Sequence, residues 1–175
     1  MEISLDKPTE IKIYSASVFY GNERVLENLS LSIREQRVGF IGRNGSGKTT
    51  LLRILAGLQE LNNGKVLIDG TEVAKKREEA VKKVGIIFQN PDHQIIFPTV
   101  GEELRFGLAQ LGLNRNEADS KVISCLKQYD KVDWFERSIS TLSQGQKHLV
   151  CLLSVLLMKP MVLLLDEPFL SLIHI

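Results

Sequence analysis

The stretch "GRNGSGKTT", residues 42–50, decides the fold of this chain. It fits the pattern G-x-x-x-x-G-K-[ST], with a short apolar run before it (37–42, "RVGFIG") and a helical pattern after it (48–58, "KTTLLRILAGL"). Glycines let the backbone turn tightly enough for successive N–H groups to face phosphate oxygens, and the N-terminus of the next helix adds partial positive charge. A strand, a glycine-rich loop and a helix in this order predict a phosphate-binding loop, called the phosphate loop below.

The phosphate loop carries side chains with expected chemical roles. Lys48 is expected to reach the β- and γ-phosphates of a nucleotide, and Thr49 to supply a hydroxyl to Mg²⁺. The alternative is a chance match in a glycine-rich turn, which the flanking strand and helix patterns disfavour. The residues predicted to bind the phosphates are Gly42, Arg43, Asn44, Gly45, Ser46, Gly47, Lys48, Thr49 and Thr50.

A second motif, "VLLLDE" at 162–167, places two acids directly after four apolar residues. This pattern predicts a buried parallel strand with charges at its carboxyl end, where open α/β sheets bind ligands. Asp166 is expected to hold Mg²⁺, and Glu167 to polarise the attacking water as general base. Taken alone, the pattern also fits an acidic loop start; together with the phosphate loop it favours a catalytic pair.

A third motif, "LSQGQK" at 142–147, begins a long helical pattern that runs to Met158. Ser143 and Gln146 have the spacing of a capping box. The motif therefore allows two interpretations: a helix cap, or a second phosphate-binding surface where Gly145 leaves the backbone bare.

Composition limits the function classes. The 175 residues are 43% hydrophobic and 25% charged, with a net charge of +1, so no overall attraction to nucleic acid or anionic lipid is expected. The apolar stretch 149–165 is interrupted by Lys159 and Pro160 and is too short on either side to span a membrane. With no signal peptide pattern, Cys125 and Cys151 are expected to be buried free thiols in a reducing cytosol.

The order of the elements predicts an α/β fold. Residues 1–35 resemble a hairpin-bearing β layer, and strands alternating with helices imply a mainly parallel sheet. The segment 91–158 is expected to form an inserted helical subdomain, whose first helix begins at the capping box of Thr99 and Glu102. The β layer and nucleotide-binding core are expected over about 1–90, with the last strand at 161–166.

These motifs give the chain a family resemblance. It looks like the nucleotide-binding subunit of an ATP-binding-cassette (ABC) transporter, a P-loop NTPase, and "LSQGQ" resembles that family's LSGGQ signature with Gln144 in place of the first glycine. In the family this segment binds the γ-phosphate of ATP held by a partner subunit. The resemblance implies ATP and Mg²⁺ as cofactors, a head-to-tail dimer of ATPase subunits, and partner-nucleotide contacts from Ser143, Gln144, Gly145 and Gln146.

Two further residues take roles from this resemblance. Gln89, after the strand pattern "VGIIF", matches the glutamine that contacts Mg²⁺ and couples to the membrane partner. Tyr20, in "VFYGNERVL", matches the aromatic residue that stacks on adenine; the alternative is a core tyrosine of the β layer. The resemblance thus implies Glu167, Lys48 and Gln89 as catalytic residues.

The stretch 88–113, "FQNPDHQIIFPTVGEELRFGLAQLGL", narrows the resemblance to the ATPases of energy-coupling-factor importers. Those importers take up vitamins such as biotin or transition-metal ions through integral membrane subunits. The resemblance therefore implies that this chain is a peripheral subunit at the cytoplasmic face of the cell membrane. His93 and His148 are interpreted as surface histidines, because neither has partners at metal-ligand spacing. The alternatives are an ABC ATPase of another transport or non-transport class, and a binding-only inactive fragment.

The end of the sequence departs from the family pattern. Leu172 fits a leucine of the family's dimer loop, but Ile173 stands where its aspartate is expected, and His174 is too close to Glu167 to be the later switch histidine. The prediction is an ABC ATPase domain over 1–169 that is truncated at its C-terminus and has little or no hydrolytic activity. One hypothesis for 170–175, "LSLIHI", is translation of CTG TCT CTT ATA CAC ATC, the transposase end used in DNA library preparation; other codons would contradict it.

Overall fold

The computed structural model describes residues 9–167, so the expectations for 168–175 lie outside the described residues. Within that range the chain forms two compact units. The first unit comprises 9–84 with 161–164, and the second comprises 85–160 with 165–167. None of the helices over 9–167 combines the length and the apolar character that a membrane crossing needs.

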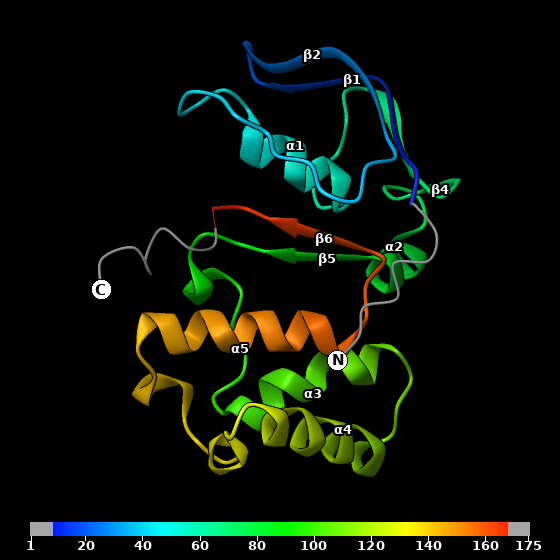
Figure 1. Ribbon diagram of the computed structural model, residues 1–175. Coiled ribbons are helices and arrows are strands. Elements are labelled where there is room, and N and C mark those ends of the chain that lie inside the picture. The colour runs from blue at the N-terminus through cyan, green and yellow to red at the C-terminus, as the bar shows by residue number, and fades with distance from the viewer. Residues whose placement is uncertain (1–8, 168–175) are drawn as a thin grey trace. The chain divides into compact units, whose positions relative to one another are not determined.

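The first unit is built on an antiparallel β layer, as predicted. Strands β1 (Ile11–Tyr20) and β2 (Glu23–Ile33) form a hairpin whose two-residue loop begins at Gly21, with a φ of 59°. Strands β3 (Asn63–Ile68) and β4 (Thr71–Glu72) complete the sheet in the order β2-β1-β3-β4 (Figure 1). Its core residues are Ile11, Ile13, Ala16, Val18, Val66 and Ile68.

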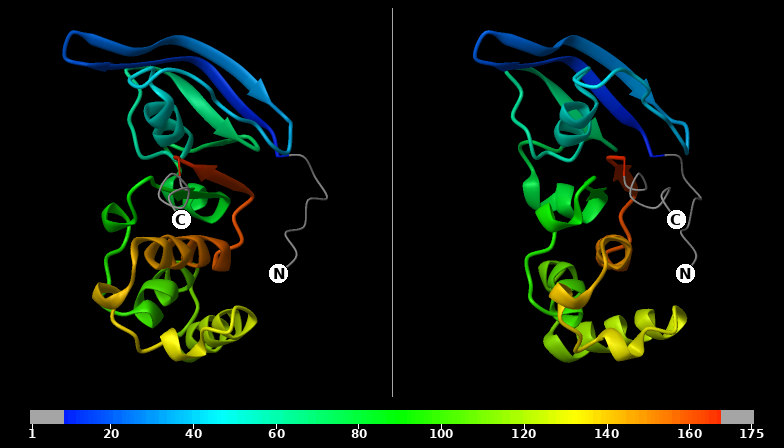
Figure 2. Two further views of the ribbon diagram at one scale, coloured as in Figure 1. Left: turned by 60° about the vertical axis from the view of Figure 1, so that its left-hand side comes forward. Right: turned by 90° about the vertical axis from the view of Figure 1, so that its left-hand side faces the viewer.

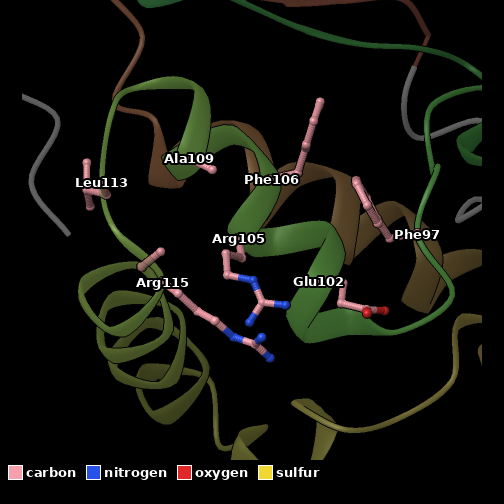
Figure 3. Close-up of a pocket in the computed structure, with 8 residues that line it drawn as sticks. Phe97, Glu102, Arg105, Phe106, Ala109, Leu113 and Arg115 are labelled. Atoms are coloured by element: carbon pink, nitrogen blue, oxygen red, sulfur yellow. The ribbon is translucent and has the colours of Figure 1, made fainter.

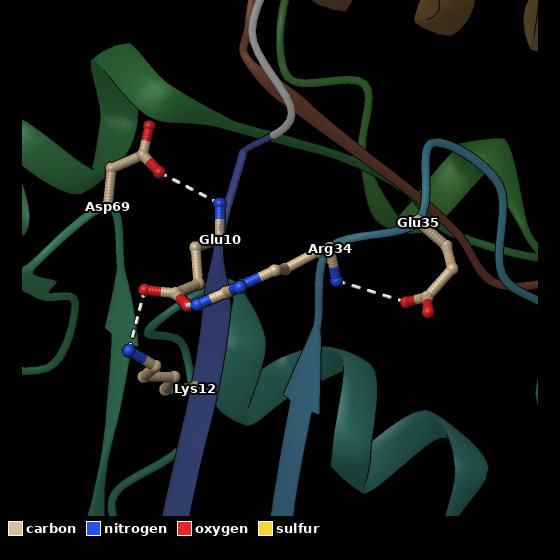
Figure 4. A network of polar contacts seen from close by, with 5 residues as sticks. All are labelled: Glu10, Lys12, Arg34, Glu35 and Asp69. Atoms are coloured by element: carbon tan, nitrogen blue, oxygen red, sulfur yellow. Dashed lines mark hydrogen bonds and ion pairs between the residues drawn. The ribbon is translucent and has the colours of Figure 1, made fainter.

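A polar network at the start of β1 ties three parts of this layer together (Figure 4). The Glu10 carboxylate accepts hydrogen bonds from Arg34, at 2.6 and 2.8 Å, and pairs with Lys12 at 2.7 Å. The backbone N–H of Glu10 donates to the Asp69 carboxylate at 2.8 Å. Lys12 and then Arg34 lower the pKa of Glu10, so this carboxylate stays charged and links the start of β1 to the end of β2, while the Glu10 N–H links it to Asp69 after β3.

Helix α1 (Lys48–Leu55) follows the phosphate loop and buries Leu51, Leu52, Ile54 and Leu55; a short helix, α2 (Arg77–Lys83), follows β4. The prediction extended α1 to residue 58, which is wrong. Gly57 takes a φ of +70°, which ends the helix, and a Cβ there would lie 2.9 Å from the carbonyl oxygen of Val73.

The expected strand before the phosphate loop is absent. Residues 37–42 have no strand assignment, Val38 is 47% exposed, and Ile41 is fully exposed. A strand exists only when a neighbouring backbone accepts and donates its ladder hydrogen bonds, and no described strand pairs with this segment. The apolar residues of 37–42 favour a strand, but among the described strands none pairs with this segment.

The second unit is mostly helical, as expected for the insert. Helices α3 (Val100–Gln110), α4 (Arg115–Gln128) and α5 (Gln144–Leu157) pack together, with short 3₁₀ turns at η1 (Pro91–His93), η2 (Val132–Trp134) and η3 (Ile139–Thr141) (Figures 1 and 2). Of the capping box predicted for α3, the Thr99 cap is present, with its hydroxyl accepting from the N–H of Glu102. The Glu102 carboxylate accepts from that hydroxyl at 2.7 Å and not from the Thr99 N–H, so the reciprocal half of the box differs from the prediction. The buried core includes Val100, Leu104, Leu108, Val122, Leu126, Trp134, Val150 and Leu153.

A buried carboxylate fixes the approach to α3. Glu103 is buried, and one of its oxygens accepts the backbone N–H groups of Ile96 at 2.9 Å and Phe97 at 3.0 Å. These charge-assisted bonds compensate for removing the carboxylate from water. The turn before α3 is therefore held by Glu103, a side chain of α3 itself.

Strands β5 (Val84–Ile87) and β6 (Val162–Leu165) form a two-stranded sheet. The N–H of Met161 donates to the Lys83 carbonyl at 2.8 Å and that of Asp166 to the Ile87 carbonyl at 2.9 Å, so the strands run parallel as predicted. The expected full burial of 162–165 is wrong: only Leu164 is buried in β6. One neighbouring strand leaves much of β6 uncovered.

The two cysteines provide a test of this packing. Cys125 and Cys151 are free and buried, as predicted, and burial together with nearby Glu103 raises the pKa of Cys151 to about 12. Burial also raises the pKa of Cys125.

Because the thiolate is the reacting form, we expect both thiols to react with iodoacetamide at pH 7 at least ~100-fold more slowly in the native protein than in urea. Mass spectrometry counts the adducts, and rapid native labelling of either thiol would contradict the packing.

Candidate functional site

The phosphate loop depends on two glycines in the left-handed backbone region. Gly45 has a φ of +79°, and Gly47, the N-cap of α1, has a φ of +87°. A Cβ on Gly47 would lie 3.1 Å from both the Leu26 side chain and the Val25 carbonyl oxygen. Only glycine takes this conformation without strain in the space available, so the loop can turn directly into the helix.

Lys48 closes over this loop. Its ammonium donates to the carbonyl oxygens of Gly42 at 2.9 Å and Arg43 at 3.0 Å. The charge therefore lies beside the loop backbone and at the N-terminus of α1, where Gly47 contributes no side-chain cap. A positive side chain and a helix N-terminus at one place form an anion-binding arrangement.

Tyr20 lies at the end of β1 with 46% of its surface exposed, and its hydroxyl donates to the Gln59 side chain at 2.9 Å. This exposure rules out the alternative of a core tyrosine. The ring is accessible for stacking, and its role toward adenine stays a prediction.

The second unit brings Gln89 and Glu167 together. Gln89 follows β5, Glu167 follows β6, and the Gln89 amide nitrogen lies 3.4 Å from a Glu167 carboxylate oxygen. Glu167 has a φ of 47°, an unusual value for a residue with a side chain, and such backbone strain gathers at functional sites. Because the two parallel strands end at the same edge, the two side chains lie side by side.

The donors expected for Mg²⁺ have suitable chemistry. Thr49 offers a hydroxyl, Gln89 an amide oxygen and Asp166 a carboxylate, and Mg²⁺ prefers such oxygen ligands together with phosphates and waters. Within 9–167 no group of three His, Cys, Asp or Glu side chains could hold a metal ion. The oxygen donors of each unit thus match the ligand chemistry of Mg²⁺, and their sharing of one ion stays a prediction.

The signature segment begins α5 with a complete capping box. The Ser143 hydroxyl accepts the Gln146 N–H at 3.3 Å, and the Gln146 side chain accepts the Ser143 N–H at 3.0 Å. The helix-cap interpretation is thus confirmed, and phosphate binding by the same segment stays a prediction.

Gln144, which departs from the family pattern, has a partner in the 3₁₀ turn η1. Its amide donates to the Asp92 carboxylate at 2.9 Å, and the Lys147 ammonium donates to the other oxygen of that carboxylate at 2.6 Å. Lys147 and then Gln144 lower the pKa of Asp92, which keeps it ionised. Sequence reasoning missed this contact, because 52 residues separate Gln144 from Asp92.

The interpretation of His148 as a surface residue is wrong. His148 is 6% exposed, with Nδ1 at 3.1 Å from the Gln144 carbonyl oxygen and Nε2 at 3.0 Å from the Gln89 carbonyl oxygen. The buried ring has a hydrogen-bond partner, because one of its nitrogens can donate to the carbonyl oxygen it faces; which nitrogen donates depends on the tautomer. His93, by contrast, is exposed, as expected.

A pocket of about 320 Å³ lies elsewhere in the second unit, on α3 and the start of α4 (Figure 3). Its aromatic side chains, Phe97 and Phe106, have ring centroids 5.2 Å apart, and Arg105 pairs with Asp119 at 2.5 Å. The other lining residues are Glu102, Ala109, Leu113, Arg115 and Ala118. The pocket contains none of the residues predicted for nucleotide chemistry, so we do not assign that chemistry to it.

Comparison with known proteins gives a consistent result. Residues 26–170 match the ABC transporter family. The chain is 47% identical over 145 residues to the biotin transport ATP-binding protein BioM of Rhodobacter capsulatus, which covers 83% of this chain and 62% of that protein. It is 37% identical over 163 residues to the energy-coupling factor transporter ATP-binding protein EcfA1 of Oenococcus oeni, covering 92% of this chain and 59% of that protein.

Solved structures agree with the fold. The cbiO1 protein of Clostridium perfringens, part of the ABC transporter complex cbiONQ, aligns with a TM-score of 0.73 at 29% identity and covers 91% of this chain and 65% of its own. The ATP-binding cassette MJ0796, a dimer bound to ADP and Pi in a post-hydrolysis state, aligns with a TM-score of 0.79 at 25% identity, covering 92% and 75%.

The phosphate loop can be tested by paired glycine substitutions. Gly45→Ala places a Cβ in open space and incurs only backbone strain, which we expect to lower the free energy of unfolding by ~1 kcal/mol. Gly47→Ala adds close contacts with Leu26 and Val25, so we expect a loss of ~2–3 kcal/mol. Urea denaturation followed by circular dichroism measures both. Equal losses would mean that the packing around Gly47 is wrong.

Proposed function

The chain belongs to the ABC transporter family, and on that premise we propose that it binds ATP through residues 42–50 and hydrolyses it within a dimer that drives a membrane importer. The observation that carries the proposal is the Lys48 ammonium held beside the phosphate-loop backbone, at the N-terminus of α1. Phosphate binding needs positive charge and N–H groups in one place, and this arrangement supplies both.

The proposed reaction is in-line attack of water on the γ-phosphate. Glu167 accepts the proton of the water, and the amide of Gln89, 3.4 Å from Glu167, orients this carboxylate. Lys48 stabilises the negative charge on the phosphates, and bound Mg²⁺, held by Thr49, Gln89 and Asp166, would neutralise the rest. The signature segment of a partner subunit, 143–146, completes the site of a head-to-tail dimer.

Import of a vitamin or metal ion is the finer part of the proposal. It is supported by the similarity to BioM and EcfA1, whose names specify biotin transport and an energy-coupling factor transporter. We place the protein at the cytoplasmic face of the membrane, bound to integral membrane subunits. The chain spans 62% and 59% of the length of these relatives, so activity and partners are proposed here for a full-length protein of this kind.

Nucleotide binding is the first test. Lys48→Ala removes the ammonium beside the loop, and we expect it to weaken binding of a fluorescent ATP analogue at least ~10-fold, the loss of one charge-assisted hydrogen bond to phosphate. Lys65→Ala is the matched control, because Lys65 is an exposed cation of β3 that lies over Tyr14. Equal binding by the Lys48→Ala variant and the unsubstituted protein would refute the site.

A companion variant separates binding from hydrolysis. Glu167→Gln keeps the size of the side chain but removes the base, so in the full-length protein we expect ATP binding to persist and turnover to fall by ~100-fold or more. Turnover near that of the unsubstituted protein would show that Glu167 is not the base.

Association with a membrane subunit tests the importer. We expect the full-length protein, affinity-tagged and extracted from its native membranes in mild detergent, to co-purify with an integral membrane protein identified by mass spectrometry. Such association would be retained in Glu167→Gln, because docking does not need the base. Purification without any integral membrane partner would favour the alternative, an ABC ATPase of a non-transport class.

A further inference from the structure

The first turns of α5 hold the segment after β5 through three side chains. Gln144 and Lys147 both donate to the Asp92 carboxylate, and His148 contacts the Gln89 carbonyl oxygen. We propose that these three residues, here called the α5 clamp, fix Gln89 relative to the signature segment, with His148 as the positioning residue for Gln89. The inference rests on the proposed function in one respect, the catalytic role of Gln89.

His148 acts on the main chain of Gln89. The contact is made at 3.0 Å by Nε2 of a buried ring, while Nδ1 lies 3.1 Å from the Gln144 carbonyl oxygen in the same helix. In the tautomer with the proton on Nε2, the ring donates from α5 to the Gln89 carbonyl oxygen and so links the helix to the backbone at Gln89. Since the side chain of Gln89 starts from that backbone and reaches to 3.4 Å from Glu167, the position of α5 determines where the amide lies.

Asp92 provides the second point of attachment. Its two oxygens accept separately from Lys147 at 2.6 Å and from Gln144 at 2.9 Å, and the Lys147 side chain is mostly buried. Two attachments three residues apart fix the orientation of a segment as well as its position. A glycine at 144, as in the usual family signature, could not make this bond, so the glutamine adds one of the three contacts.

Hydrogen bonds within the segment 88–94 also hold it together. Asn90 accepts the N–H of Asp92 at 3.0 Å, and the Gln94 side chain accepts the N–H of Phe88 at 3.2 Å. The segment 88–94 is therefore held together locally and attached to α5 at Gln89 and Asp92. In a head-to-tail dimer the signature segment faces the partner's nucleotide, so the α5 clamp would transmit occupancy of one site to the catalytic glutamine of the other.

Hydrogen exchange of the backbone amides in 88–95 tests the clamp directly, with or without nucleotide. His148→Leu removes the contact to Gln89, and we expect exchange of these amides to rise about 3- to 10-fold, matching the loss of one hydrogen bond. His148→Gln keeps an N–H donor at similar reach, so exchange should stay within about twofold of the unsubstituted rate. His93→Leu, the same change at an exposed position of the same segment, is the matched control.

The exchange rates of the three variants decide whether the α5 clamp exists. Faster exchange in His148→Leu alone supports it, and equal exchange in all three variants overturns it. If His148→Leu does not fold, Lys147→Met and Asp92→Asn test the second attachment: faster exchange of 88–95 in both supports the clamp, and unchanged exchange overturns it.

Kinetics separates positioning from binding. In the full-length ATPase we expect His148→Leu to lower kcat about 3- to 10-fold while the Kd for ATP changes less than twofold, because the phosphate loop is untouched. His148→Gln should restore kcat. Failure of the unsubstituted protein to bind ATP would refute the proposed function, while hydrogen exchange would still decide the clamp.

Discussion

The left-handed turn at Gly47 is the constraint on which the proposed nucleotide site of this chain depends. Because α1 begins at the next residue, the φ of +87° at Gly47 determines where the helix N-terminus points and where Lys48 begins. Leu26 and the Val25 carbonyl, from strand β2, fill the space beside this glycine. The β layer and the phosphate loop are thus joined at a position that has no room for a side chain.

The sequence predicted well those features that neighbouring residues determine. Ser143 and Gln146 form the expected capping box, and Thr99 caps α3, because both sets of hydrogen bonds close within three residues. Features that depend on distant residues were missed. The strand expected at 37–42 lacks a ladder partner, and the burial of His148 depends on Gln89, 59 residues earlier.

The neighbouring residues Glu102 and Glu103 show the same difference between features that local spacing reveals and features that depend on distant residues. Glu102 was recognised as part of a cap, which spacing alone reveals, whereas its neighbour Glu103 was not assigned a role. Glu103 is the buried carboxylate that holds the N–H groups of Ile96 and Phe97. An acid in a helical pattern normally indicates a solvent-facing position, so only the folded chain shows that this one supports the turn leading into α3.

The capping box of α5 has a consequence for phosphate affinity. Ser143 already accepts the N–H of Gln146, so a phosphate that used this N–H group would have to displace the serine cap. Loss of a serine cap costs about 1 kcal/mol, which any incoming anion would have to offset. Anion binding at this N–H group is therefore an exchange of one acceptor for another, and only an acceptor stronger than a serine hydroxyl, such as a phosphate oxygen, would gain from it.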